Sequence, residues 1–227
     1  MEDINNIDND DSNDNNDEKN YNGIKVTLLG NSGVGKTCII LRYTKNEYND
    51  NTISSRGVSY SSKIITINNK DVQLDLWDTA GQEKFRSLGM YFYKDSHIVL
   101  LVYDITNRES FEDLKNVWYN DLKKYGEQYT VLAVVGNKCD MYEEENTVPE
   151  EEARKFAEEK NAEFMLVSAK TGDNINVLFN ILTNKYFDPN FQTKIEEKND
   201  QLEGSVKIKK RNEKEEKLIN ARKKGCC

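Results

Sequence analysis

A loop rich in glycine and hydroxyl groups follows the first apolar run of the chain. Residues 30–37 read Gly-Asn-Ser-Gly-Val-Gly-Lys-Thr and precede a helix-like stretch. Glycines allow backbone amides to turn toward a phosphate, and the start of a helix favours negative charge. Lys36 would contact the β- and γ-phosphates, and the Thr37 hydroxyl would bind Mg²⁺. The spacing predicts a nucleoside triphosphate site without separating ATP from GTP. The residues expected to surround the phosphates are Ser32, Gly33, Val34, Gly35, Lys36, Thr37 and Cys38.

A carboxylate and a glutamine end a second apolar run, in the order Asp78-Thr79-Ala80-Gly81-Gln82-Glu83. Asp78, at the carboxyl end of a strand, is placed to hold Mg²⁺ through a water molecule. The Gly81 amide is a candidate donor to the γ-phosphate, and Gln82 is the candidate for orienting an attacking water. A surface turn after an edge strand is the alternative interpretation of this segment alone.

Two further segments could recognise a purine base, Asn137-Lys138-Cys139-Asp140 and Ser168-Ala169-Lys170. Asp140 could accept hydrogen bonds from the ring N–H and the exocyclic amine of guanine, which adenine does not offer together. Asn137 would tie its loop to the phosphate side, and the Lys138 stem would lie along the base. The Ala169 amide would face the guanine carbonyl. Because an unpaired buried polar group can lower affinity by ~10⁴-fold, the two segments predict guanine rather than adenine.

Apolar runs that alternate with helix-like stretches must position these four segments. The runs occupy residues 24–30, 63–67, 72–77, 98–104, 131–136 and 164–168, and the helix-like stretches 36–45, 83–93, 108–124, 149–159 and 175–186. Near-continuous Val, Ile and Leu runs separated by helices are typical of a parallel sheet buried on both faces. Asn68-Asn69 predicts a hairpin and one antiparallel edge strand. We expect an α/β fold, a single P-loop NTPase domain with a six-stranded, mostly parallel sheet and helices on both faces.

The two ends of the chain differ from its middle in composition. Residues 1–22 are mostly Asp, Glu and Asn, so we expect a disordered acidic arm; docking on a basic partner is the alternative. Residues 23–187 form the expected domain, and residues 188–227 form a flexible tail that becomes basic beyond Gly204. The net charge of −8 argues against nucleic-acid binding.

A few single residues carry further expectations. Pro149 is placed to open a helix, where its missing amide costs nothing. His97, the only histidine, opens an apolar run and is expected to be structural. The four cysteines show neither zinc spacing nor a disulfide framework, which favours a reducing, cytosolic compartment.

The four segments resemble the nucleotide-binding motifs of Ras-like small GTPases, and they are most similar to the Rab branch. The Rab-like marks are Trp77, the runs 84–88 and 91–93, and the segment 101–106, Leu-Val-Tyr-Asp-Ile-Thr. The resemblance implies a GTP hydrolase that is slow without a GAP and uses Mg²⁺. It implies that Tyr48 stacks on guanine and that Tyr60, Trp77 and Phe92 form an aromatic effector surface. Ordinary core packing is the alternative for these three rings.

The resemblance also implies partners and a location. They are a guanine-nucleotide exchange factor, a GAP, a GDI or escort protein, and effectors, all acting on a monomeric GTPase. The chain would regulate vesicle trafficking from the cytoplasmic face of intracellular membranes, with a soluble cytosolic pool. An RNA-binding protein that uses the basic tail is a remote alternative, because the tail lacks interleaved aromatic residues.

One loop departs from the family pattern. Ser55 stands where Rabs carry a threonine whose hydroxyl reaches Mg²⁺ in the GTP state, and Arg56 and Ser59 replace an apolar and an acidic residue. Serine keeps the hydroxyl, so we expect Ser55 to bind Mg²⁺ and the nucleotide, with a less populated GTP-ordered loop. Arg56 is expected to meet solvent or an effector acid; an arginine finger in cis is the alternative. A membrane scaffold with weak switching is therefore the second function that the sequence suggests.

The sequence ends in Gly225-Cys226-Cys227, which resembles the double-cysteine end on which Rabs receive two geranylgeranyl groups. Two lipid chains anchor a protein stably where one does not. We expect Cys226 and Cys227 to be lipidated; a disordered tail with incidental cysteines is the alternative.

Overall fold

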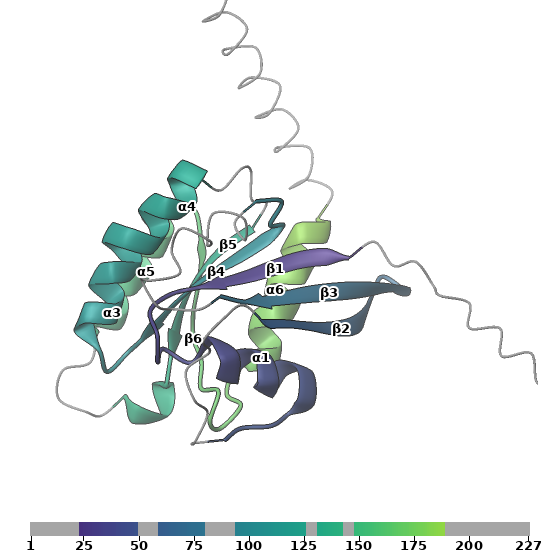
Figure 1. Ribbon diagram of the computed structural model, residues 1–227, viewed down its shortest axis with the longest axis horizontal. Helices are drawn as coiled ribbons and strands as arrows, with labels where there is room; N and C mark the ends of the chain where they lie inside the picture. The colour runs from purple at the N-terminus through teal and green to yellow at the C-terminus, as the bar shows by residue number, and fades with distance from the viewer. Residues whose placement is uncertain (1–22, 50–58, 80–93, 126–130, 143–147, 189–227) are drawn as a thin grey trace, which may run out of the picture.

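Six strands form one sheet in the order β2-β3-β1-β4-β5-β6 (Figure 1). The structure, a computed structural model, describes residues 23–49, 59–79, 94–125, 131–142 and 148–188. Strand β2 pairs antiparallel with β3, and all other neighbouring strands are parallel. The predicted fold class is confirmed. The acidic arm, the predicted helix 83–93 and the basic tail lie outside the described residues.

The strands are β1 Ile24–Leu29, β2 Ser59–Ile67, β3 Lys70–Asp78, β4 Ile98–Asp104, β5 Val131–Asn137 and β6 Glu163–Leu166. The longer helices are α1 Lys36–Lys45, α3 Arg108–Asp113, α4 Tyr119–Tyr125, α5 Glu150–Glu159 and α6 Ile175–Phe187. A π-helical turn, η2, spans Leu114–Trp118, and a 3₁₀ turn, η3, spans Cys139–Met141.

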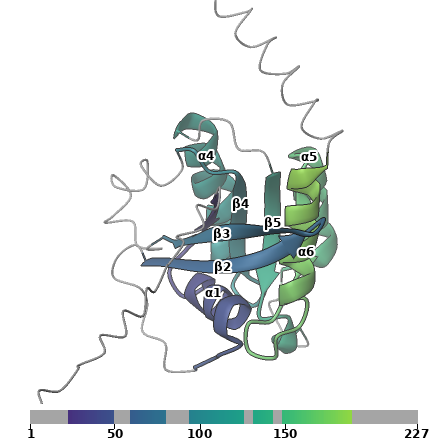
Figure 2. The same cartoon turned by 90° about the vertical axis from the view of Figure 1, so that its right-hand side faces the viewer.

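Helices cover the two faces of the sheet, as Figures 1 and 2 show. On one face, apolar side chains of α1 and α6, including Ile39, Tyr43 and Phe179, pack against the strands. On the other face, α3, η2, α4 and α5 supply a second core that includes Phe111 and Leu122. Because β4 and β5 lie between these two layers, all their residues are buried. This explains why their sequences read as unbroken apolar runs.

The β2–β3 hairpin turns at Asn68 and Asn69, as predicted. Both residues have positive φ values, 51° and 60°, which asparagine tolerates better than most residues. Strand β2 begins at Ser59, four residues before the apolar run that predicted it. Polar residues 59–62 pair with residues 78–75 of β3, so backbone hydrogen bonding rather than burial extends this edge strand.

The helix predicted over residues 108–124 is interrupted. The turn η2 separates α3 from α4, and the Tyr119 amide donates to the Leu114 carbonyl five residues earlier. Pro149 lies just before the first residue of α5, with φ −57° and ψ 130°, rather than inside the helix. None of the helices in the described ranges combines the length and apolarity that a membrane crossing requires.

His97 joins the amino-terminal ends of β1 and β4. Its Nδ1 accepts a hydrogen bond from the Lys25 amide at 2.9 Å, and its ring packs edge-on against Tyr186 of α6. An imidazole nitrogen that accepts a hydrogen bond must be unprotonated. Burial lowers the pKa of His97; nearby Asp95 and Asp75 oppose this shift and Lys25 adds to it. These contacts agree with the structural role predicted for the residue.

Acid should weaken the fold through His97. Its folded pKa lies below the unfolded value of about 6.5, so its stabilisation is complete above that pH and is lost as the pH falls through the folded pKa. Asparagine keeps an acceptor oxygen but does not titrate, so His97→Asn should lose less stability between about pH 7 and about pH 5. Urea unfolding of both proteins across this range measures the difference. Equal losses would show that His97 does not carry the effect.

Candidate nucleotide-binding site

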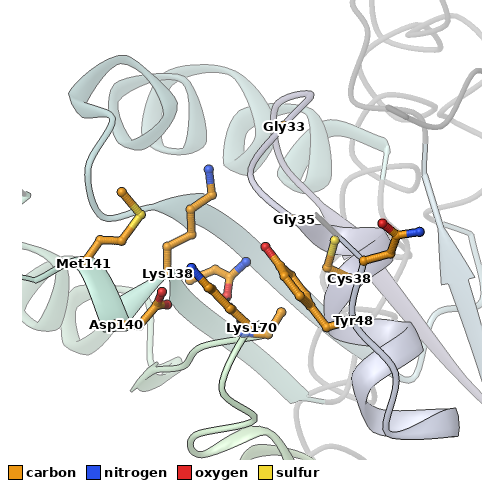
Figure 3. Close-up of a pocket in the computed structure, with 11 residues that line it drawn as sticks. Gly33, Gly35, Cys38, Tyr48, Lys138, Asp140, Met141 and Lys170 are labelled. Carbon is orange, nitrogen blue, oxygen red and sulfur yellow. Dashed lines mark hydrogen bonds between the residues drawn. The ribbon is translucent and has the colours of Figure 1, made fainter. Parts of the chain in front are cut away.

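A pocket of about 290 Å³ lies where the loops after β1, β5 and β6 meet (Figure 3). Its lining residues are Gly33, Gly35, Cys38, Tyr48, Asn49, Asn137, Lys138, Asp140, Met141, Ala169 and Lys170. Parallel strands bring their carboxyl ends to one edge of a sheet, and such edges are where ligands bind in α/β folds. The structure thus gathers three of the four predicted segments around one cavity.

The loop of residues 30–37 depends on glycine for its shape. Gly35 has φ 95° and directly precedes α1. A Cβ at this position would lie 2.2 Å from Asn137 Nδ2, so a larger residue would displace that amide. Val34 is buried beneath the loop, whereas Ser32 and Gly33 are exposed. The amides of this loop and the start of α1 form a surface suited to phosphate oxygens.

Lys36 lies under the same loop and is only 5% exposed. Its Nζ donates to the Gly30 carbonyl at 2.7 Å and to the Asn31 carbonyl at 2.9 Å. Burial lowers the pKa of Lys36 to about 8, although Asp78 favours the charged form. The side chain is therefore held along the loop, with its ammonium ready for an anion.

Thr37 and Asp78 bring two oxygen groups together at the adjacent strand end. The Thr37 hydroxyl donates to Asp78 Oδ2 at 2.6 Å, and Asp78 is buried. Mg²⁺ prefers oxygen ligands and usually completes its shell with water and substrate phosphates. This pair therefore fits a magnesium site that relies on few protein ligands.

Asn137 connects the phosphate loop with the loop after β6. Its Nδ2 donates to the Val34 carbonyl at 2.9 Å, and its Oδ1 accepts from the Ala169 amide at 3.1 Å. Asn137 is 2% exposed. One buried amide therefore sets the position of the two loops relative to each other. Its link to the phosphate loop was predicted, and its link to Ala169 was not.

Asp140 and Lys138 are held in place by neighbouring side chains. Ser168 Oγ donates to Asp140 Oδ1 at 2.6 Å. Lys138 adopts φ 69°, and its ammonium pairs with Asp104 Oδ2 at 2.5 Å, so its stem runs along the pocket. Figure 3 shows Tyr48 and Cys38 on the opposite side of the pocket from Lys138 and Asp140. A flat aromatic base between these walls would have Tyr48 to stack on and a carboxylate at its edge.

The remaining predicted site residues divide into two groups. Tyr60 and Trp77 lie opposite each other on β2 and β3, with ring centroids 5.5 Å apart in an edge-on arrangement. Tyr60 is 52% exposed, so core packing does not account for it. Ser55, Arg56, Gly81, Gln82, Phe92, Cys226 and Cys227 lie outside the described residues.

Arg42 contributes to the site without having been predicted. From α1, its Nε donates to the Ala169 carbonyl at 2.8 Å, and its Nη2 to the Lys170 carbonyl at 2.7 Å. The partners are more than 120 residues apart in sequence, and no motif signals the contact. Asn49 and Met141 also line the pocket and were not predicted, although Asn49 directly follows Tyr48 and Met141 directly follows Asp140.

Loss of the Arg42 contacts should loosen the loop that carries Ala169. Arg42→Gln cannot span both carbonyls, so two hydrogen bonds from a charged donor are weakened. We expect GDP to dissociate about tenfold faster, which corresponds to about 1.4 kcal/mol. Stopped-flow release of a fluorescent GDP analogue measures this, with Lys45→Gln in the exposed last turn of α1 as control. Similar rates for both variants would mean that Arg42 does not position the loop.

Comparisons with known proteins all match the chain to one family. A model of the Ras family matches residues 25–188. Ras-related protein Rab-26 of Rattus norvegicus is 41% identical over 156 residues, which cover 68% of this chain and 60% of that protein. GTP-binding protein YPT1 of Saccharomyces cerevisiae is 37% identical over 155 residues, covering 68% of this chain and 74% of that protein. Ras-related protein RABD2c of Arabidopsis thaliana is 37% identical over 159 residues, covering 70% and 78%. The chain thus spans about 60% of the length of the Rab-26 relative.

Proposed function

Because the chain belongs to the Ras family, as a Rab-type small GTPase, we propose that it binds GTP and GDP and hydrolyses GTP to regulate vesicle trafficking. The observation that carries this proposal is the placement of Asn137, which ties the phosphate loop to the loop after β6 around one pocket. A pocket built in this way has a phosphate end and a base end at a fixed separation.

At the base end, Asp140 accepts hydrogen bonds from the two N–H groups of guanine. Ser168 orients the carboxylate through Oδ1. The Ala169 amide donates to Asn137 Oδ1 in the structure, and it would turn to the guanine carbonyl when the base is bound. Tyr48 stacks on the ring, and the Lys138 stem lies along it, with Lys170 closing the lining. Adenine does not offer the Asp140 carboxylate both N–H donors, which explains the proposed preference for guanine.

At the phosphate end, the amides of residues 32–38 and the Lys36 ammonium bind the phosphate oxygens. Thr37 directly and Asp78 through a water molecule would hold Mg²⁺, and Ser55 would join them in the GTP state. When bound, the ion neutralises charge that develops on the phosphates. Gly81 donates its amide to the γ-phosphate, and Gln82 orients the attacking water.

The nucleotide state is proposed to control protein partners and membrane binding. Effectors would bind Tyr60, Trp77, Phe92 and Arg56; the exposure of Tyr60 beside Trp77 supports this. Lipids on Cys226 and Cys227 would anchor the chain, with a GDI or escort protein carrying the soluble pool. An exchange factor would load GTP and a GAP would accelerate its hydrolysis, while the GTPase itself remains monomeric. Imaging beside a Cys226→Ser, Cys227→Ser double variant tests the anchor.

Single-turnover hydrolysis tests the proposed activity. The chain loaded with radiolabelled GTP and Mg²⁺ should release phosphate at roughly 10⁻⁴ to 10⁻³ per second, and a broad-range Rab GAP should accelerate this by ~10³-fold or more. Gln82→Leu should slow the unassisted reaction on the order of tenfold, because the attacking water loses its hydrogen-bond partner. The Ser55 and Arg56 departures favour the second candidate, a membrane scaffold with weak switching. That candidate predicts bound GTP and no phosphate release, even with a GAP.

A further inference from the structure

We propose that Asp113 and Trp118 position the phosphate-binding loop by holding Asn31 between them, so that α3 and η2 control the affinity for the nucleotide phosphates. Asn31 Nδ2 donates to Asp113 Oδ2 at 2.6 Å, and Trp118 Nε1 donates to Asn31 Oδ1 at 2.7 Å. The inference rests on the proposed function, since it concerns the same site.

The chemistry of the three side chains requires this arrangement. An indole nitrogen only donates, and an ionised carboxylate only accepts. The amide of Asn31 offers one acceptor and one donor and thus matches both neighbours in a single orientation. Aspartate at position 31 would repel Asp113, and alanine or serine would reach neither group. The two partners therefore account for an asparagine at position 31.

The π-helical turn η2 explains how one helical segment presents both partners. Trp118 lies five positions after Asp113, and in an α-helix that spacing places side chains about 140° apart around the axis. The turn Leu114–Trp118 is wider, with the Tyr119 amide bonded to the Leu114 carbonyl. The extra residue in the turn rotates Trp118 back toward the side of Asp113. Leu114 and Leu122 are fully buried, so the segment is anchored in the core.

Asp113 and Trp118 act on the nucleotide through the backbone of Asn31. The Asn31 carbonyl accepts from Lys36 Nζ at 2.9 Å, so the orientation of this peptide helps to set the position of the ammonium. Lys36 is the cation proposed to contact the β- and γ-phosphates. Asp113 and Trp118 are thus positioning residues, since neither is among the residues that line the pocket. Their effect should appear in phosphate binding and not in base recognition.

The test compares nucleotide binding by the full chain with Trp118→Phe, which keeps the ring and removes the N–H donor. We expect GDP to dissociate about tenfold faster, as for the loss of one buried hydrogen bond that supports a charged group. The affinity for GMP, which lacks the β-phosphate, should stay within about twofold, because Lys36 acts beyond the α-phosphate. Tyr119→Phe is the matched control, because Tyr119 directly follows Trp118 but packs its ring against Phe156. It should leave the GDP dissociation rate and the GMP affinity unchanged.

A double-mutant cycle separates positioning from general packing. Asn31→Ala should also accelerate GDP release about tenfold, and adding Trp118→Phe to it should give little further change. Asp113→Ala, at a partly exposed helix position, is the milder second variant if Trp118→Phe does not fold, and it should accelerate GDP release in the same direction.

Three results would overturn the inference while leaving the proposed function intact. In the first, the wild-type chain binds GDP and Trp118→Phe releases it at the wild-type rate. In the second, the effects of Asn31→Ala and Trp118→Phe on GDP release multiply independently. In the third, GMP loses affinity as much as GDP does. A wild-type chain that binds no guanine nucleotide would instead overturn the proposed function itself.

Discussion

Asp140→Asn is expected to lower the affinity for GDP by about 10⁴-fold and to create affinity for xanthosine diphosphate. Guanine presents two N–H donors to this position, and asparagine offers one acceptor and one donor. Xanthine has a carbonyl in place of the amine, so its edge matches the asparagine. The Ser168 hydroxyl that donates to Asp140 Oδ1 can donate equally to an amide oxygen, which keeps the loop in place.

Competition binding against a fluorescent GDP analogue, with GDP and xanthosine diphosphate as competitors, measures this exchange. Asp140→Ala serves as the control, because it removes the acceptors without supplying a donor and should weaken both nucleotides. A loss of GDP affinity below about tenfold in Asp140→Asn, with no gain for xanthosine diphosphate, would show that Asp140 does not read the base.

Lys36→Met is expected to lower the affinity for GTP and GDP by roughly 10³-fold. Methionine preserves most of the stem but removes the ammonium, and losing one member of a desolvated charge contact costs about 2–5 kcal/mol. The two loop carbonyls that accept from Lys36 would also lose their donor. Titration of a fluorescent GDP analogue measures the change. Lys45→Met, in the exposed last turn of the same helix, should bind as the wild type does.

A Lys36→Met variant that binds within about tenfold of the wild type would contradict the phosphate role of the loop. Unfolding of the ligand-free variant should show no matching loss of stability. Lys36 is a buried cation, so its removal relieves a desolvation cost in the free protein. The loss is thus expected to be specific to the nucleotide.

Much of the fold followed from local sequence patterns. Strands β4 and β5 were predicted because burial on both faces requires unbroken apolar sequence, and the hairpin was predicted from Asn68 and Asn69. The first four residues of β2 were not, because they are held by pairing with β3 rather than by apolar burial. The π-helical turn was also missed, since the periodicity of residues 108–124 does not show where one extra residue widens a turn.

In the candidate site, too, local motifs could be predicted from the sequence and tertiary contacts could not. Lys36, Asn137, Asp140 and Ala169 could be placed because each belongs to a short motif that directly follows a strand. Arg42, Asp113 and Trp118 could not, because their contacts join segments that lie 82 to 128 residues apart. Motifs identify the groups that touch a ligand, whereas the residues that hold those groups are set by tertiary packing.

The nucleotide bound to the purified chain provides the most direct test of the central claim. The chain should be purified in Mg²⁺, denatured, and the released small molecules identified by chromatography and mass spectrometry. We predict GDP or GTP in nearly equimolar amount, displaced by added guanine nucleotides and not by adenine nucleotides. A chain that is folded but carries no nucleotide and binds none on addition, or that carries ADP or ATP, would contradict the account.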